Sequence, residues 1–138
     1  MKRSFIAGLF LALIAMSSFA SEADAVDAAK AETLAWLELT DSGEYRSSWE
    51  SASSLFRAAV SNEDWEKALS AVRNPIGALK SREVATSTFS TTLPGVPDGE
   101  YVVFQFNSSF EHKASAVETV TAMKDTDGVW RVAGYFIK

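Results

Sequence analysis

Three charged residues in the second half of the sequence are of the types that could form a polar site. Glu118 lies in the middle of an apolar, alternating segment, Arg82 lies on another predicted strand, and Arg73 lies at the end of a predicted helix. A carboxylate on a half-buried strand needs a partner, and arginine supplies a bidentate one. If these segments meet in the fold, the three residues would share one concavity, with Gln105 or Tyr135 nearby. These five residues are the candidate ligand-binding site.

Two interpretations of this set stay open at the level of sequence. In one, the set is a structural ion pair that fixes a helix against the sheet. In the other, it is the polar floor of a site for a small anionic or zwitterionic ligand. An enzyme with Glu118 as general base is a further alternative, because a buried carboxyl with a raised pKa can accept a proton. That alternative fails if Glu118 is held in a bidentate pair with arginine.

Other catalytic chemistry has little support in the sequence. The chain has no Cys, so zinc thiolate sites, cysteine nucleophiles and disulfides are excluded. Its one histidine, His112, lies in a predicted turn, where the side chain is usually solvated. Residues 125–128 resemble the start of a calcium loop but lack the acidic residue at the twelfth position. Phosphate-binding glycine loops are absent. The sequence therefore predicts no catalytic residue, no metal site and no cofactor.

The N-terminus has the pattern of a targeting segment. Lys2 and Arg3 precede an apolar run over residues 5–16, and the small residues Ser18 and Ala20 fit a cleavage site. We expect a signal peptide over residues 1–20 and a single mature domain over residues 21–138, located in the periplasm or secreted. The apolar run is too short for a comfortable membrane span, so no span is expected after cleavage.

The charge of the chain narrows the class of partner. Asp and Glu outnumber Lys and Arg by 18 to 13, a formal net charge of −5 at pH 7. An acidic protein without a basic run is a poor candidate for binding nucleic acid. With no disulfides, stability has to come from packing, for which the chain has 4 Trp and 9 Phe.

The first half of the mature chain has helical periodicity. Apolar residues at helical spacing predict helices over residues 25–40 and 45–59, and a capping box at Ser61 predicts a third helix that ends at Asn74-Pro75. The aromatic residues of these helices are expected to form a layer that packs on a sheet: Trp36, Trp49, Phe56 and Trp65.

After residue 77 the pattern changes to the period of two that strands have. It predicts strands over residues 79–89, 101–108, 115–124 and 129–137, with a hairpin turn at residues 125–128. The first strand suits a sheet edge and the second a central position. The predicted fold is α+β, with three helices packed on a curved four-stranded antiparallel sheet.

The connection over residues 93–99, with the sequence LPGVPDG, contains two of the three prolines of the chain. Proline fixes φ and removes a ladder donor, so no strand runs through this segment. It is either a rigid, wide connection between two strands or a preorganised rim over one end of the sheet.

Several segments together resemble one bacterial family. They are Trp49 with Phe56, RNPIG (73–77), SRE (81–83), LPGVPDGEY (93–101), ETVT (118–121) and DGVWRVAGYFI (127–137). In combination they resemble the exported family known as domain of unknown function 4019. The resemblance implies a small periplasmic α+β domain of the cone-shaped nuclear-transport-factor or cystatin-like kind. It implies no activity and no catalytic residue.

The sequence favours a non-enzymatic module that binds a ligand or an envelope partner. A homodimeric assembly protein is the other alternative to the enzyme with Glu118. The homodimer would use an exposed face of the sheet and predicts that Tyr101, Val103 and Phe89 contact a second copy.

Overall fold

The structure is a computed structural model that describes residues 17–138. Most of the predicted signal peptide therefore lies outside the described residues, and its cleavage stays a prediction. The elements in chain order are α1 (Ser17–Asp41), α2 (Tyr45–Glu50), α3 (Ser54–Ala59), α4 (Asn62–Ile76), β1 (Leu79–Ser90), β2 (Tyr101–Phe110), β3 (Lys113–Lys124) and β4 (Trp130–Ile137). No helix of this described part is long and apolar enough to cross a membrane.

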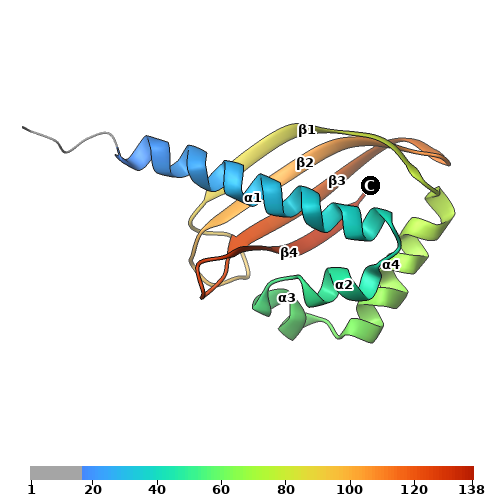
Figure 1. Ribbon diagram of the computed structural model, residues 1–138, viewed down its shortest axis with the longest axis horizontal. Helices are drawn as coiled ribbons and strands as arrows, with labels where there is room; N and C mark the ends of the chain where they lie inside the picture. Colours follow the sequence, from blue (N-terminus) through green and yellow to red (C-terminus); the bar gives the residue numbers. More distant parts are fainter. Residues whose placement is uncertain (1–16) are drawn as a thin grey trace, which may run out of the picture.

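The four strands form one antiparallel sheet in the order β1-β2-β3-β4. The sheet arches behind α1, which runs across it, while α2, α3 and α4 gather beside the β4 edge (Figure 1). The α+β prediction, with helices on a four-stranded antiparallel sheet, is confirmed. The edge position of β1 and the central position of β2 are confirmed as well.

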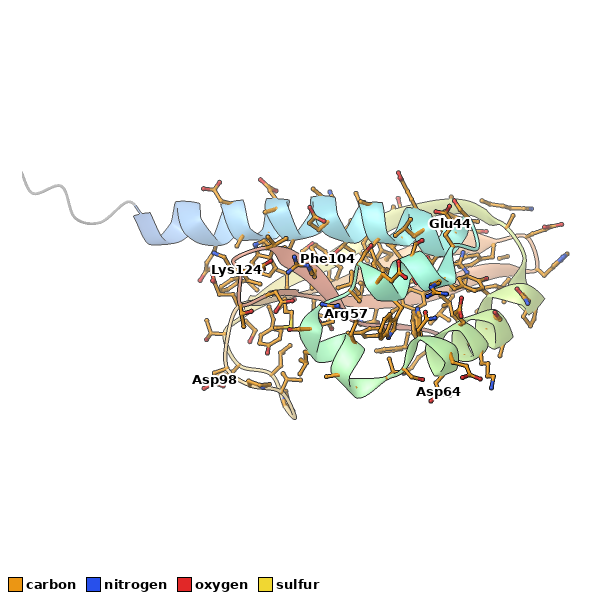
Figure 2. All side chains as sticks on the ribbon, turned by 60° about the horizontal axis from the view of Figure 1, so that its bottom comes forward. Glu44, Arg57, Asp64, Asp98, Phe104 and Lys124 are labelled. Atoms are coloured by element: carbon orange, nitrogen blue, oxygen red, sulfur yellow. The ribbon has the colours of Figure 1, made fainter. Side chains whose placement is uncertain are left out.

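The core lies between the helices and one face of the sheet. Phe104 and Phe106 of β2 are fully buried, with ring centroids 5.9 Å apart, and Figure 2 shows Phe104 between the ribbon of α1 and that of the sheet. Helix α1 contributes residues at helical spacing, of which Ala29, Trp36 and Leu37 are buried. Burial of each large apolar side chain contributes roughly 1.5–3 kcal/mol.

The predicted aromatic layer is present and is fixed by hydrogen bonds at its polar edges. Trp65 packs edge-on against Phe56 at 4.9 Å and lies 6.1 Å from Trp36. The indole nitrogens of Trp36 and Trp65 both donate to Ser48, to its carbonyl and its hydroxyl respectively. Trp49 is only half-buried and packs at the margin of the core. These aromatic residues are structural.

The helix predicted over residues 45–59 is wrong in one respect, because the chain forms two short helices there. The backbone N–H of Ser53 donates to the carbonyl of Val132 in β4 at 2.8 Å, while its hydroxyl accepts from the N–H of Phe56. Ser53 is therefore the N-cap of α3. A serine that bonds neighbouring backbone competes with helix continuation, and this one also ties the helix layer to the edge strand.

The third predicted helix begins where the capping pattern places it but ends later than predicted. The Ser61 hydroxyl accepts from the N–H of Asp64, and α4 continues through Pro75 to Ile76. Gly77, at φ +77°, ends it, and a side chain there would come within 3.0 Å of Glu111. The stop is therefore the glycine, which reaches a backbone conformation that other residues rarely adopt.

The proline-containing connection joins β1 to β2 as an exposed loop. Figure 2 shows Asp98 on this loop, away from the helices. The hydroxyl of Tyr101 donates to the carbonyl of Pro97 at 2.5 Å, and the N–H of Gly99 donates to the carbonyl of Thr91 at 3.0 Å. These bonds lie within the connection and its flanking strands, which favours the interpretation as a rigid connection.

Candidate functional site

A buried network of charges joins α1 and α4 to the sheet. At its centre is Glu118, whose side chain is fully buried on the helix-covered face of β3. One carboxylate oxygen, Oε1, accepts from Arg82 Nε at 2.7 Å and from Ser108 Oγ at 2.6 Å. The other, Oε2, accepts from Arg82 Nη2 at 3.1 Å and from Tyr135 Oη at 2.6 Å. Both oxygens are thus occupied by donors from three other strands.

Strand register explains why these side chains meet. Arg82 of β1 is opposite Ser108 of β2, which is opposite Ala116 of β3. Glu118 follows Ala116 by two residues, and residues two apart point to the same face of a strand. Pairing of the strands alone therefore places Arg82, Ser108 and Glu118 side by side.

The network continues into the helices through Asp41, the last residue of α1. Arg82 donates to both of its carboxylate oxygens, from Nη1 at 2.8 Å and from Nη2 at 2.9 Å. Arg73 of α4 donates from Nη2 to Asp41 Oδ1 at 2.8 Å and from Nη1 to Thr40 Oγ1 at 3.1 Å. The Arg73 guanidinium also lies 4.8 Å from the centroid of the Phe110 ring. Charges alternate along the line Glu118, Arg82, Asp41, Arg73, so each buried carboxylate adjoins at least one guanidinium.

The pKa values follow from this arrangement. Burial disfavours ionisation of Asp41, but hydrogen bonds from Arg82 and Arg73 outweigh it and hold the pKa of Asp41 below its ordinary value. Burial likewise opposes the charge of Arg82, and its bonds to Asp41 and Glu118 raise its pKa nonetheless. Burial and the neighbouring Glu118 raise the pKa of Tyr135. At neutral pH Tyr135 is therefore a neutral donor beside charged partners.

Of the five residues predicted for the site, the structure brings four together: Arg73, Arg82, Glu118 and Tyr135. Gln105 is not among them. It lies on the opposite, exposed face of β2, where Thr86 Oγ1 donates to its side-chain oxygen at 3.3 Å. Asp41 and Ser108 were missed. Asp41 directly follows the helix predicted over residues 25–40 and carries no sign of a partner on the sheet, and Ser108 carries no signal apart from its even spacing from Phe106.

A second, smaller charge cluster lies at the β3–β4 turn. Asp125 accepts from the N–H and the hydroxyl of Ser54, at 3.0 and 2.7 Å, and so fixes the start of α3. These bonds hold the pKa of Asp125 at about 2, against an ordinary value of 3.8. Arg131 bonds Asp125 at 3.3 Å and Asp127 at 2.8 Å. The carboxylates that resemble a calcium loop are thus engaged by protein donors. In the described part of the chain, no three acidic or histidine side chains are grouped to hold a metal ion.

Comparisons with known proteins identify a family and a fold. A family model described as "Protein of unknown function (DUF4019)" matches residues 32–135. The chain belongs to this family. No curated protein matches the sequence. A solved structure of a protein from Catenulispora Acidiphila is similar in fold, with a TM-score of 0.57 and 10% sequence identity, over 86% of this chain and 93% of that one.

The surface of the protein has two hollows that could take part in binding. Arg82 and Ser108 contribute to the lining of a shallow hollow of about 360 Å³ among β1, β2 and β3, together with polar residues such as Ser81 and Asn107. A more apolar groove of about 180 Å³ lies between α4 and β4. We call it the α4–β4 groove, and its lining comprises Trp65, Ala68, Leu69, Val72, Tyr135, Phe136 and Ile137.

The surface predicted to form a homodimer is only partly exposed. Tyr101 is only 1% exposed, and its hydroxyl bonds within the same chain. Phe89 packs against the core, because the register that pairs it with Val102 places it on the helix-covered face. Val103 and Tyr101 both point to the uncovered face, but Tyr101 is covered there by the loop that contains Pro97 and Gly99. A contact of Tyr101 with a second copy is therefore wrong, while dimerisation itself stays a prediction.

Proposed function

We propose that this protein is a non-enzymatic binding module of the bacterial cell envelope that docks onto a partner protein through the α4–β4 groove. The observation that carries the proposal is the exposure of large apolar side chains at that groove. Val72 of α4 lines the groove and is 42% exposed, and Phe136 of β4, at the sheet edge beside it, is 52% exposed. Trp65 and Leu69 close the floor between them. Apolar side chains that converge on a groove are typical of protein-binding surfaces.

The polar network favours a binding role over catalysis. A general base needs a carboxylate oxygen within reach of a substrate proton. Both oxygens of Glu118 accept two hydrogen bonds each, and Arg82 holds the carboxylate in the bidentate geometry that the enzyme hypothesis could not accommodate. We assign this network the structural role of fixing α1 and α4 to the sheet.

Location in the envelope rests on the N-terminal sequence. Lys2, Arg3 and the apolar run over residues 5–16 support export, and an acidic chain without cysteine is compatible with the periplasm or with secretion. Sequencing the N-terminus of the protein recovered from the envelope tests this, with Ser21 as the expected first residue.

Site-specific photo-crosslinking in cells tests the docking proposal. A photoreactive amino acid is placed at position 72 or 136 in the groove, or at position 129 as a matched control. Val129 is 42% exposed, like Val72, but does not line the groove. We expect one defined crosslinked partner from positions 72 and 136 and none from position 129. The adduct from position 136 should disappear in a Val72→Asp background. Equal crosslinking from all three positions would contradict the proposal.

A ligand site is the second candidate, favoured by the hollow that adjoins Arg82 and Ser108. Its lining of hydroxyl and amide groups, which also includes Arg82 and Glu83, suits a small zwitterionic molecule. Native mass spectrometry of the protein purified from the envelope tests it. The side chain of Asn107 is exposed, so it can be replaced without disturbing the core. Extra non-protein mass on the wild-type protein that is absent from Asn107→Ala would favour a ligand. Wild-type protein without extra mass would count against one.

A further inference from the structure

The free edge of β1 has an unusual composition at its C-terminal end. This strand is the last of the sheet on its side, and no described residue beyond β2 forms a backbone hydrogen bond to it. Figure 1 shows no strand beyond β1, and it shows α1 crossing in front of the C-terminal end of β1. Natural edge strands are usually protected by charges, proline or bulges. The charges of β1, Lys80, Arg82 and Glu83, all precede residue 84, and a register irregularity separates them from residues 86–90. Residues 86–90 therefore present an uncharged, proline-free edge.

A groove runs along this same stretch of the strand. It has a volume of about 450 Å³ and is lined by Val26, Ala23, Glu22 and Asp27 of α1 and by Ser87 and Phe89 of β1. We call it the α1–β1 groove. Ser87 and Phe89 are two residues apart, so both face the helix side of the sheet. Phe89 and Val26 form the apolar part of the lining, and Glu22 and Asp27 form an acidic rim.

The acidic rim lacks compensation within the described chain. Neither Glu22 nor Asp27 is in an ion pair with a described residue, and both are exposed. The exposed side of α1 continues this charge with Asp24, Glu32 and Glu38 against the single Lys30. The potential beside the free strand edge is therefore negative.

We propose that the β1 edge binds an extended, basic segment of a partner protein as an additional strand. Backbone groups of the segment would pair with residues 86–89, which is the mode called β-augmentation. Side chains of an added strand alternate in direction, so every second one would enter the α1–β1 groove. There an apolar side chain meets Phe89 and Val26, and lysine or arginine meets Glu22 and Asp27.

Charge decides between this occupant and a second copy of the chain. Pairing two β1 edges would bring two acidic α1 helices toward each other, and like charges across an interface oppose binding. A basic segment gains from the same field. The site is separate from the α4–β4 groove, because β1 and β4 are at opposite edges of the sheet.

Binding of defined peptides to the protein purified from cells with its natural N-terminus tests the proposal. The probe is an eight-residue peptide of alternating lysine and valine with blocked ends. One control peptide has glutamate in place of every lysine, and another has proline at two central valines, which removes ladder donors. Amide NMR titration gives both the affinity and the binding site. We expect the lysine peptide to shift and protect amides of residues 85–90, and both controls to bind on the order of tenfold more weakly or not at all.

Two double variants separate local charge from net charge. Glu22→Gln with Asp27→Asn should weaken the lysine peptide on the order of tenfold, because two exposed charge contacts are lost. Glu63→Gln with Asp64→Asn changes the net charge equally but lies on α4 and should leave affinity unchanged. The proposal would be overturned if both double variants weakened binding of the lysine peptide equally, or if the glutamate peptide bound as well as the lysine peptide. It would also be overturned if the amide shifts were confined to the α4–β4 groove, or if the protein formed a β1–β1 homodimer.

Discussion

The two charge clusters of the protein both fix a helix to the sheet, but they neutralise their carboxylates differently. In the buried network, Asp41 and Glu118 are paired with Arg82, and Arg73 reaches Asp41 as well. At the β3–β4 turn, the strongest contacts of Asp125 are neutral donors of Ser54, with Arg131 more distant. Glu118, which is fully buried on a strand, is neutralised by an opposite charge, whereas Asp125, which is also buried, is satisfied mainly by the donors at a helix start. The first cluster should therefore be the more sensitive to loss of one member.

The largest effect is expected for Glu118→Ala. The change leaves the hydroxyls of Ser108 and Tyr135 and one side of Arg82 without their acceptor in a dry interior. Removal of one partner from a buried pair costs about 3–5 kcal/mol of unfolding free energy. Urea denaturation followed by circular dichroism measures it.

Gln105→Ala is the matched control for that prediction. Gln105 is a polar residue of a central strand, as Glu118 is, but it lies on the exposed face, so the expected change is within about 0.5 kcal/mol. Equal effects of the two substitutions would show that burial does not determine how much the network contributes to the free energy of unfolding.

Asp125→Asn should have an intermediate effect that depends on pH. The folded-state pKa of about 2 lies below the ordinary 3.8, so the unfolded chain binds more protons between these values. The contribution of Asp125 to the free energy of unfolding is therefore complete above about pH 5 and is lost as the pH falls toward 2. Allowing for solvent screening, the substitution should cost about 1–2 kcal/mol at pH 7.

Denaturation curves at pH 7, 4 and 2.5 test this prediction. The difference between wild type and Asp125→Asn should shrink as the pH is lowered. Asp127→Asn is the control, because Asp127 is more exposed and bonds mainly Arg131 and its own turn, and its effect should be smaller at every pH. A difference for Asp125→Asn that stays constant across this range would contradict the lowered pKa.

The contrast between the clusters also shows how far the sequence predicts the site. Arg82 and Glu118 were found because a charge on an apolar strand has to be paired, and that rule needs only local pattern. Gln105 was placed wrongly because one sequence does not settle which alternate set of β2 faces the helices. Asp41 was missed because its position depends on the length of α1 and on how the helix crosses the sheet.

The fold was more predictable than the site for the same reason. Strand limits and order follow from local alternation and from short turns such as residues 125–128. The division of residues 45–59 into two helices depends instead on the bond from Ser53 to Val132, which are 79 positions apart in the chain. No periodicity within the helical segment reports a bond to a distant strand.

Within the buried network, the smallest effect is expected for Tyr135→Phe, which removes one of the four donors of Glu118 and keeps the ring that packs at 5.6 Å from Trp36. Because Arg82 and Ser108 still satisfy Glu118, the loss should be about 1 kcal/mol at pH 8. Tyr101→Phe also loses one hydroxyl bond, to a backbone carbonyl outside the network, and should cost less.

The effect of Tyr135→Phe should also depend on pH in the alkaline range. The pKa of Tyr135 is raised above its ordinary 10.0, so the folded protein holds its proton where the unfolded chain releases it. Its contribution is complete below about pH 10 and is lost as the pH rises further. Denaturation of wild type and Tyr135→Phe from pH 8 to 11 should therefore show their stabilities converging above pH 10. Parallel curves would mean that Tyr135 titrates alike in both states, and the hydroxyl would then have no special environment beside Glu118.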